Sequence, residues 1–449
     1  MASIHSMDLT KGPVLKKLLQ FTIPIVLSSL LQQFYNAADT IVVGQFADTE
    51  DLAAVGSTGS VTGLLLNLFL GLGTGVNIVC SNLYGGRKKE ELSRCMHTAV
   101  LLALVAGVCL SGVGFVFAEP LLRLMNSPEN VIGRASLYMK ICFLGVPASF
   151  LYNFCAAILR AHGDTKRPML ILIVTGLVNV ILNLVLVISF QMGVAGVAIA
   201  TITAQYLSML AVIWILFSSK GEFRMKIRKL RFYWAEFSRI LAVGLPCGLS
   251  SILTNLFNVF FQSNINTFGD TFMAATTSFN SILSFVYLIF NAFCSACVSF
   301  AGQNYGAKQY ARIDKLFLCS ALSASVTVAA LALIITLIPR TLLGFYTDDD
   351  AVIQIAIPLL LMQSWGALSC CIGESASGCL RGMGKTAVTT TAGVLCTTAT
   401  RLIWLFLIFP LHQTTVMLYA CYPLSYFLNA VLHVSLYLKY RNEWLRNSE

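Results

Sequence analysis

The residue best suited to chemistry in this sequence is an aspartate inside a long apolar stretch. The stretch covers residues 18–44 and contains one proline, Pro24, and one carboxylate, Asp39. A charged side chain at the centre of a bilayer costs at least ~2.5 kcal/mol, so such residues usually pair, bind an ion or face water. A carboxylate there can take up a proton or bind a small cation. We predict that Asp39 belongs to an ion-coupling site.

Two asparagines in another apolar stretch form a second polar feature. Asn179 and Asn183 are four residues apart, so they share one face of a helix and can direct their amides to the same interior point. Their carbonyl oxygens could bind a small hard cation. Asparagines also join membrane helices through hydrogen bonds, and the sequence leaves both interpretations open.

Charged residues also lie deep in the second half of the chain. Glu374 is the only acidic residue well inside an apolar run there, which makes it a candidate partner for a cationic substrate. Arg401 lies about fifteen residues into the next run and needs a partner in the membrane. It could form a structural ion pair with Glu374, or it could contact substrate or act in gating.

The composition identifies an integral membrane protein. Of the 449 residues, 57% are hydrophobic and only 11% are charged, whereas about a quarter of the residues of soluble domains are charged. The net charge of +10 comes from basic connections between apolar runs, so it does not indicate nucleic-acid binding. The histidines are few and scattered, and we expect no metal site other than a possible sodium site at Asp39.

The apolar runs predict an all-α protein with twelve transmembrane helices. Alternate connections carry 25 of the 30 lysines and arginines, which predicts that both termini lie in the cytoplasm of a cell-membrane protein. We predict an N-terminal lobe at 1–217, a basic cytoplasmic linker at 218–239 and a C-terminal lobe at 240–449. The predicted spans are 18–44, 52–84, 96–118, 131–159, 169–190, 194–217, 240–267, 272–304, 316–338, 352–380, 387–409 and 415–438.

The two halves repeat one another. Pro24 and Asp48 recur as Pro246 and Asp270, displaced by 222 residues. After a one-residue gap the displacement is 221, and Leu159-Arg160-x-x-Gly163-x-Thr165 recurs as Leu380-Arg381-x-x-Gly384-x-Thr386. Because each repeat has six helices, both have the same orientation in the membrane. Two parallel bundles facing a central cleft are typical of a transporter that works by alternating access.

These motifs together resemble the multidrug and toxic compound extrusion (MATE) transporters, over essentially the whole chain. The resemblance is carried by the Pro24 to Asp39-Thr-x-x-x-Gly44 run, Leu52-Ala-Ala-Val-Gly56, Tyr84-Gly85, Gln303-Asn-Tyr-Gly306 and the paired Leu-Arg-x-x-Gly-x-Thr loops.

The resemblance implies a V-shaped, two-lobed antiporter. It would export amphipathic, often cationic, compounds in exchange for protons or sodium, with no other cofactor. It also implies that Asp39, Asn179, Asn183 and Thr201 form the N-lobe coupling site. One departure is that Asn183 stands where relatives often have an aspartate, so we favour protons over sodium.

We name a wider set of substrate-binding candidates and expect a monomer in the lipid bilayer. Asn153 is the repeat counterpart of Glu374, and neutral residues replace an acid that some relatives carry on the seventh helix. Aromatic residues at cleft positions would suit varied substrates. The candidates are Glu374, Arg401, Asn153, Gln33, Tyr35, Asn255, Asn258, Gln262 and Trp365.

Three other functions remain open from the sequence alone. A flippase for lipid-linked sugars would need a cleft dense in arginine and lysine. A membrane-embedded enzyme would need a nucleophile, base or metal ligands converging in the apolar runs, and none appears. A channel is also compatible with the apolar runs, although the two-lobed repeat favours a carrier.

Overall fold

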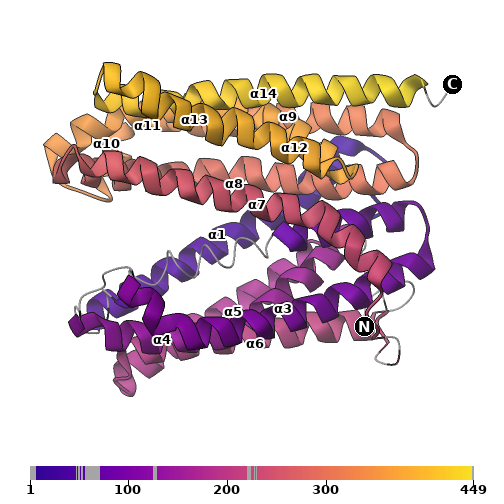
Figure 1. Cartoon of the computed structure of the whole chain (residues 1–449), viewed down its shortest axis with the longest axis horizontal. Coiled ribbons are helices and arrows are strands. Elements are labelled where there is room, and N and C mark those ends of the chain that lie inside the picture. The colour runs from indigo at the N-terminus through magenta and orange to yellow at the C-terminus, as the bar shows by residue number, and fades with distance from the viewer. Residues whose placement is uncertain are drawn as a thin grey trace. The chain divides into compact units, whose positions relative to one another are not determined.

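The structure is a computed structural model that describes residues 7–46, 48, 51, 54–55, 71–124, 129–219, 224–226, 228 and 230–446. Within these residues every regular element is a helix (Figure 1), which confirms the predicted all-α fold. Eleven helical segments in this described part are long and apolar enough to cross a membrane. The predicted span 52–84 lies largely outside the described residues, although residues 71–85 are helical.

Each predicted span other than 52–84 coincides with one helical segment. The first half contains α1 (Val14–Phe46), α3 (Lys89–Leu124), α4 (Glu129–Ala161), α5 (Lys166–Leu184), the π-helical η1 (Val185–Ser189) and α6 (Gly193–Ser218). The second half contains α7 (Trp234–Asn266), α8 (Asp270–Gly306), α9 (Tyr310–Leu337), α10 (Pro339–Gly344), α11 (Asp350–Gly382), α12 (Thr386–Gly393), η4 (Val394–Ala399), α13 (Thr400–Ile403), η5 (Trp404–Ile408), η6 (Phe409–Leu411) and α14 (Thr415–Arg446).

The connection between the halves is shorter than the predicted linker 218–239. Helix α6 ends at Ser218 and α7 begins at Trp234, so residues 234–239 are helical. Glu236 in the first turn of α7 is buried, although it is a charged residue close to the basic Arg231 and Arg239. The charge pattern alone could not separate these helical residues from the connection.

The chain forms two compact units whose boundaries fall inside helices. Unit 1 comprises Met1–Asp8 and Ile23–Leu245, and unit 2 comprises Leu9–Thr22 and Pro246–Glu449. The boundaries in α1 and α7 lie beside Pro24 and Pro246, which occupy the same place in the two repeats. A proline inside a helix removes one backbone hydrogen bond and bends the helix. The first helix of each repeat is therefore divided at an equivalent proline.

Unit 1 is held together by close packing of α3, α4, α5 and α6. Helix α4 packs against α3 and α6, and α5 packs against α6. Small residues permit the closest approaches, as is usual in membrane helices. A Cβ atom added at Gly107 of α3 would lie 2.7 Å from the Cα of Pro147 in α4. Phe143, Phe150 and Phe154 of α4 fill the core of this unit.

Unit 2 is organised around α11, which packs against α8, α9 and α14 (Figure 1). Glycines again set the distance between helices. A Cβ atom at Gly378 would lie 2.7 Å from the carbonyl oxygen of Cys294, and one at Gly382 would lie 2.5 Å from that of Val298. Helices α8 and α11 thus touch along their backbones.

Turns at equivalent places in the two halves have the same geometry. Gly163 and Gly384 both have positive φ, 89° and 81°. Each donates its amide to the carbonyl of an arginine three residues earlier, Arg160 at 2.9 Å and Arg381 at 2.8 Å. This matches the repeat that the sequence predicts.

The paired glycines allow a test of this turn. Alanine at φ near +85° costs about 1–2 kcal/mol, and at Gly163 its Cβ would also lie 2.1 Å from the Met7 carbonyl oxygen, whereas Gly384 has open space. We expect Gly384→Ala to lower the thermal unfolding midpoint of the detergent-solubilised protein slightly and Gly163→Ala to lower it more. Equal midpoints for the two variants would contradict the described turn.

Candidate functional site

Four predicted residues meet in unit 1 although they come from three helices. The Asn183 amide on α5 donates to Oδ1 of Asp39 on α1. The Thr201 hydroxyl on α6 donates to Oδ2 of Asp39 at 3.1 Å. Asn179 closes the ring, because its oxygen accepts from Asn183 at 3.4 Å and its amide nitrogen lies 3.4 Å from the Thr201 hydroxyl. We call these four residues the polar ring.

An aromatic contact fixes α1 against α5 beside the polar ring. Tyr35 lies one turn before Asp39, and its ring rests over Gly176, where a Cβ atom would lie 1.7 Å from the ring. The Tyr35 hydroxyl also donates to the backbone oxygen of Leu172 at 2.9 Å. Any larger residue at Gly176 would push α1 away, so this glycine helps to set the distance between Asp39 and the asparagines.

The polar ring contains one negatively charged group and one oxygen atom that accepts no hydrogen bond from the described residues. Asp39 accepts from two neutral donors and forms no ion pair with any residue that the structure describes. The side-chain oxygen of Asn183 is buried and has no hydrogen-bond partner in the same part of the chain. A protonated carboxyl group could donate to such an oxygen if the amide turned, and a small cation could be bound by carboxylate and amide oxygens together. The chemistry of these groups fits either ion.

The polar ring borders a cavity of about 420 Å³ inside unit 1. Asp39, Asn179 and Thr201 line it, whereas Asn183 is fully buried behind them. Two substrate candidates, Tyr35 and Asn153, also line it. The described residues that line it are Gln32, Tyr35, Asn36, Asp39, Ser149, Phe150, Tyr152, Asn153, Leu172, Thr175, Gly176, Asn179, Thr201, Ala204, Gln205 and Ser208.

The cavity is lined by a glutamine of α1 that was not among the predicted residues. Gln33 is exposed and does not line the cavity, whereas Gln32 does. Gln32, Tyr35, Asn36 and Asp39 are spaced by three, one and three residues, which places them on one face of a helix. That spacing was available in the sequence and would have selected Gln32.

Arg401 in unit 2 is surrounded by aromatic rings. Its Nε donates to the Ser425 hydroxyl at 2.8 Å. Its guanidinium lies 4.0 Å from the ring centre of Tyr422, 5.1 Å from that of Tyr426 and 5.7 Å from that of Phe257. Aromatic faces attract cations, most strongly where water is excluded. The structural ion pair with Glu374 is not formed.

Glu374 has a different environment on α11. It is half-buried, and its carboxylate interacts with the Cys294 thiol and with the charge of Arg381. Neither Glu374 nor Arg401 lines the cavity of unit 1.

The remaining candidates of unit 2 lie on α7 and α11. Asn255 is half-buried on α7, and Asn258 and Gln262 on the same helix are exposed. The Gln262 amide donates to Asn266 at 2.9 Å. Trp365 donates to the Thr336 hydroxyl of α9 at 3.1 Å and is 44% exposed.

The repeated helices and the polar cavity define a class of protein, a multi-pass membrane transporter built from two similar halves. The family profile MatE matches this chain twice, at residues 24–185 and again at 246–407. The chain therefore belongs to the MatE family, whose members are transporters of small molecules and not enzymes. The double match also confirms the internal repeat, because its two parts are displaced by the 222 residues that separate Pro24 from Pro246.

Several known proteins resemble the chain over most of its length. The "Probable multidrug resistance protein YoeA" of Bacillus subtilis is 27% identical, with 80% of this chain and 79% of that protein aligned. The multidrug export protein MepA of Staphylococcus aureus is 21% identical, with 84% and 83% aligned. A solved multidrug resistance MATE transporter in an outward-facing conformation has a TM-score of 0.90 at 22% identity, covering 99% and 100% of the two chains. The similarity to this solved structure shows that the chain has the same fold.

The contacts of Arg401 generate a stability prediction. Ser425→Ala would remove the acceptor of a buried, charged donor, and such a loss costs about 1–3 kcal/mol. We expect a lower thermal unfolding midpoint for this variant. Ser435→Ala is the matched control, because Ser435 is exposed on the same helix and donates only to the Val431 oxygen at 2.7 Å. Equal midpoints for both variants would show that the Ser425 contact contributes nothing.

Proposed function

We propose that this protein exports amphipathic, often cationic, compounds in exchange for protons, with the polar ring as its coupling site. One observation carries the proposal: Asp39, the only carboxylate among the described residues that line the unit 1 cavity, is bound by neutral donors and has no cationic partner in that part of the chain. The multidrug relatives support the choice of substrates. The flippase alternative is less well supported, because no lysine or arginine is among the described residues that line this cavity.

Proton binding would change the attachment of α1. When Asp39 is ionised, Asn183 and Thr201 both donate to it and join α1 to α5 and α6. A proton on Asp39 turns one oxygen into a donor, and the unpartnered Asn183 oxygen is the nearest available acceptor of the ring. The amide must then turn and withdraw its own donor. The two protonation states therefore favour different hydrogen bonds between helices.

A single carboxylate is enough for useful coupling. One proton moving down 100 mV releases roughly 2.3 kcal/mol, which supports about a fifty-fold gradient of an uncharged compound. Sodium would have only one formal negative charge in the polar ring to offset its dehydration, since Asn183 is neutral. This difference is our reason for favouring protons.

The placement in the cell follows from the basic connections. We propose a monomer in the cell membrane with both termini in the cytoplasm, because 25 of the 30 basic residues lie on alternate connections. Export then moves substrate from the side that carries most of the basic residues.

Removing the titratable group should uncouple transport. We expect Asp39→Asn to abolish proton-driven export from proteoliposomes while binding of a fluorescent cationic drug remains measurable. Asp270→Asn is the matched control, because Asp270 is exposed in the first turn of α8. Uphill export by Asp39→Asn would disprove the role of Asp39.

The hydroxyl of Thr201 offers a finer test. Thr201→Val keeps the shape of the side chain but removes a donor to a charged group, which is worth about 1.5–3 kcal/mol. We expect export at least tenfold slower for Thr201→Val and near wild type for Thr201→Ser, measured in the same vesicles. Equal rates in all three proteins would exclude the hydroxyl from the mechanism.

The driving ion can be identified directly. We expect wild-type proteoliposomes to export drug when a pH gradient is imposed at fixed sodium and voltage. A sodium gradient at fixed pH and voltage should have no effect. Export that follows sodium alone would refute proton coupling while leaving the export function intact.

A further inference from the structure

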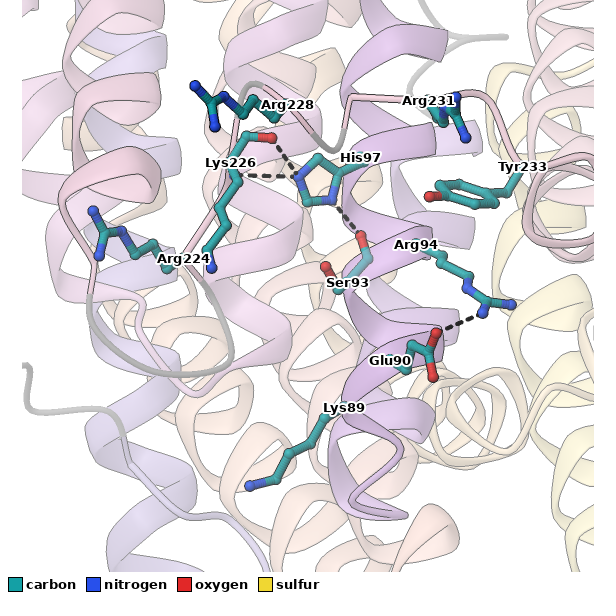
Figure 2. Close-up of a pocket in the computed structure, with 10 residues that line it drawn as sticks. All are labelled: Lys89, Glu90, Ser93, Arg94, His97, Arg224, Lys226, Arg228, Arg231 and Tyr233. Atoms are coloured by element: carbon teal, nitrogen blue, oxygen red, sulfur yellow. Dashed lines mark hydrogen bonds and ion pairs between the residues drawn. The ribbon is translucent and has the colours of Figure 1, made fainter.

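A second cavity in unit 1, of about 730 Å³, is strongly basic (Figure 2). It lies between the first turns of α3 and the chain segment that leads into α7. Six of the ten residues that line it are basic and only one is acidic. The lining residues are Lys89, Glu90, Ser93, Arg94, His97, Arg224, Lys226, Arg228, Arg231 and Tyr233. We call it the basic cavity.

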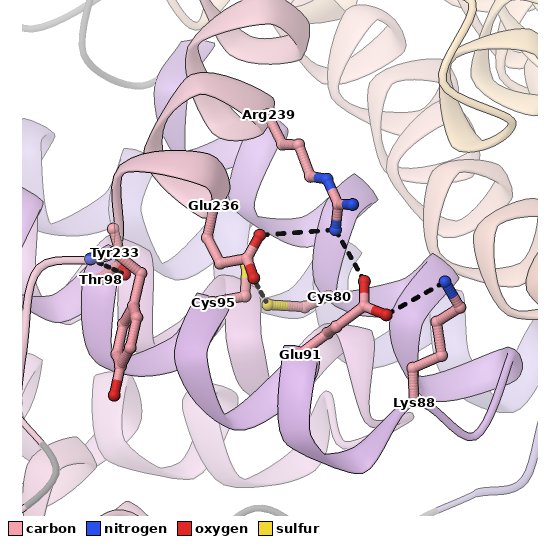
Figure 3. A network of polar contacts seen from close by, with 8 residues as sticks. All are labelled: Cys80, Lys88, Glu91, Cys95, Thr98, Tyr233, Glu236 and Arg239. Carbon is pink, nitrogen blue, oxygen red and sulfur yellow. Dashed lines mark hydrogen bonds and ion pairs between the residues drawn. The ribbon is translucent and has the colours of Figure 1, made fainter.

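The acidic residues near the basic cavity are already occupied. Glu90 accepts from Arg94 at 2.7 Å. Glu91 lies outside the lining and accepts from Arg239 at 2.7 Å, and Arg239 also lies 3.4 Å from Glu236 (Figure 3). The pair of Glu91 with Arg239 joins α3 to the start of α7, and each of these carboxylates already has an arginine partner.

Four cations of the basic cavity consequently remain uncompensated. They form no ion pair with any residue in the described part of the chain, and all four are exposed to solvent. These four are Arg224, Lys226, Arg228 and Arg231.

The basic segment is held in place by hydrogen bonds to α3. The buried His97 ring donates from Nδ1 to the Ser93 oxygen at 2.6 Å, and its Nε2 accepts from the Lys226 amide at 3.3 Å (Figure 2). The Tyr233 amide donates to the Thr98 hydroxyl at 3.2 Å (Figure 3). The segment that carries the four cations is therefore fixed against α3.

Aromatic residues beside the basic cavity indicate its depth relative to the membrane. Phe232 and Trp234 are 45% and 70% exposed. They cluster with Phe237, with ring centres 4.8–5.8 Å apart. Exposed aromatic clusters at the ends of membrane spans are typical of the lipid–water interface. Spans begin at Lys89 and Trp234 and end at Ser218, so the basic cavity lies at the level of lipid headgroups.

We propose that the basic cavity binds the phosphate-bearing headgroup of an anionic membrane lipid. Arginine offers a planar fork of donors that matches phosphate, and basic pockets at the ends of membrane helices bind such headgroups. The bound lipid would place a negative charge among the four cations and hold the connection between α6 and α7 against α3. The basic cavity shares no residue with the cavity of the polar ring, so the proposal does not depend on proton coupling.

Lipid titration of the purified full-length protein tests the proposal. The probe is phosphatidylglycerol added to detergent micelles, with phosphatidylcholine as the uncharged comparison, and bound lipid is counted by native mass spectrometry. Each basic residue near an anionic lipid contributes roughly fivefold in affinity. We expect Arg224→Gln with Arg228→Gln to weaken phosphatidylglycerol binding at least tenfold. Replacing both by lysine should retain most of the affinity.

The control variant for this titration removes two positive charges from another part of the surface. Lys315 and Lys439 are exposed on unit 2, and Lys315→Gln with Lys439→Gln should leave binding near wild type. Equal weakening by this pair would show attraction to overall charge and would overturn the site. Unchanged binding in the Arg224 and Arg228 variant would overturn it too, provided that its unfolding midpoint matches wild type.

A second titration, with soluble phosphate compounds, distinguishes a lipid headgroup from free phosphate as the ligand. Inorganic phosphate and glycerol phosphate are titrated in phosphatidylcholine micelles, with the thermal unfolding midpoint as readout. We expect no stabilisation at millimolar concentrations, whereas phosphatidylglycerol stabilises the wild type. Stabilisation by soluble phosphate that the Arg224 and Arg228 variant loses would overturn the assignment to lipid.

Discussion

The absence of water in the membrane interior is the constraint on which unit 1 depends. A carboxylate there must find its hydrogen bonds inside the protein. Asp39 obtains them from Asn183 and Thr201, so a single charge joins α1 to both α5 and α6. The contact of Tyr35 with Gly176 supports the same arrangement, because it lets α1 approach α5 closely enough for these bonds.

The duplicated half repeats the place of the polar ring but not its chemistry. At a displacement of 222 residues, the counterparts are Phe261 for Asp39, Phe257 for Tyr35 and Arg401 for Asn179. In unit 2 the rings of Phe261 and Tyr422 lie 5.2 Å apart, and Arg401 stacks on Tyr422. The π-helical segment η4 adds a residue to its helix just before Arg401, which restores the displacement of 222 after the loops that are displaced by 221. In the second repeat a neutral ring thus stands in the place of the Asp39 carboxylate, and a cation in the place of the Asn179 amide.

Most of the fold could be predicted from the sequence, because apolar runs of membrane length and glycines at repeated turns are local signals. The site was predictable only in part. Asp39 stands out by its charge, whereas Gln32 differs from Gln33 only by which helix face reaches α5. The ion pair between Glu374 and Arg401, one of the two interpretations that the sequence left open, is absent from the structure. The two residues lie in neighbouring spans, but the sequence does not give the distance between them. It also does not show that aromatic rings surround Arg401.

The difference between the halves bears on where coupling can reside. Arginine stays protonated at every pH that a cell meets, so Arg401 cannot exchange a proton with either side of the membrane. The aromatic rings around Arg401 also attract its charge without gaining or losing a proton themselves. Asp39 has the opposite properties, since it can lose its charge and since its neutral donors can change partners. Under the proposed function, duplication allowed one copy of the site to keep a fixed charge for packing while the other kept the ion exchange.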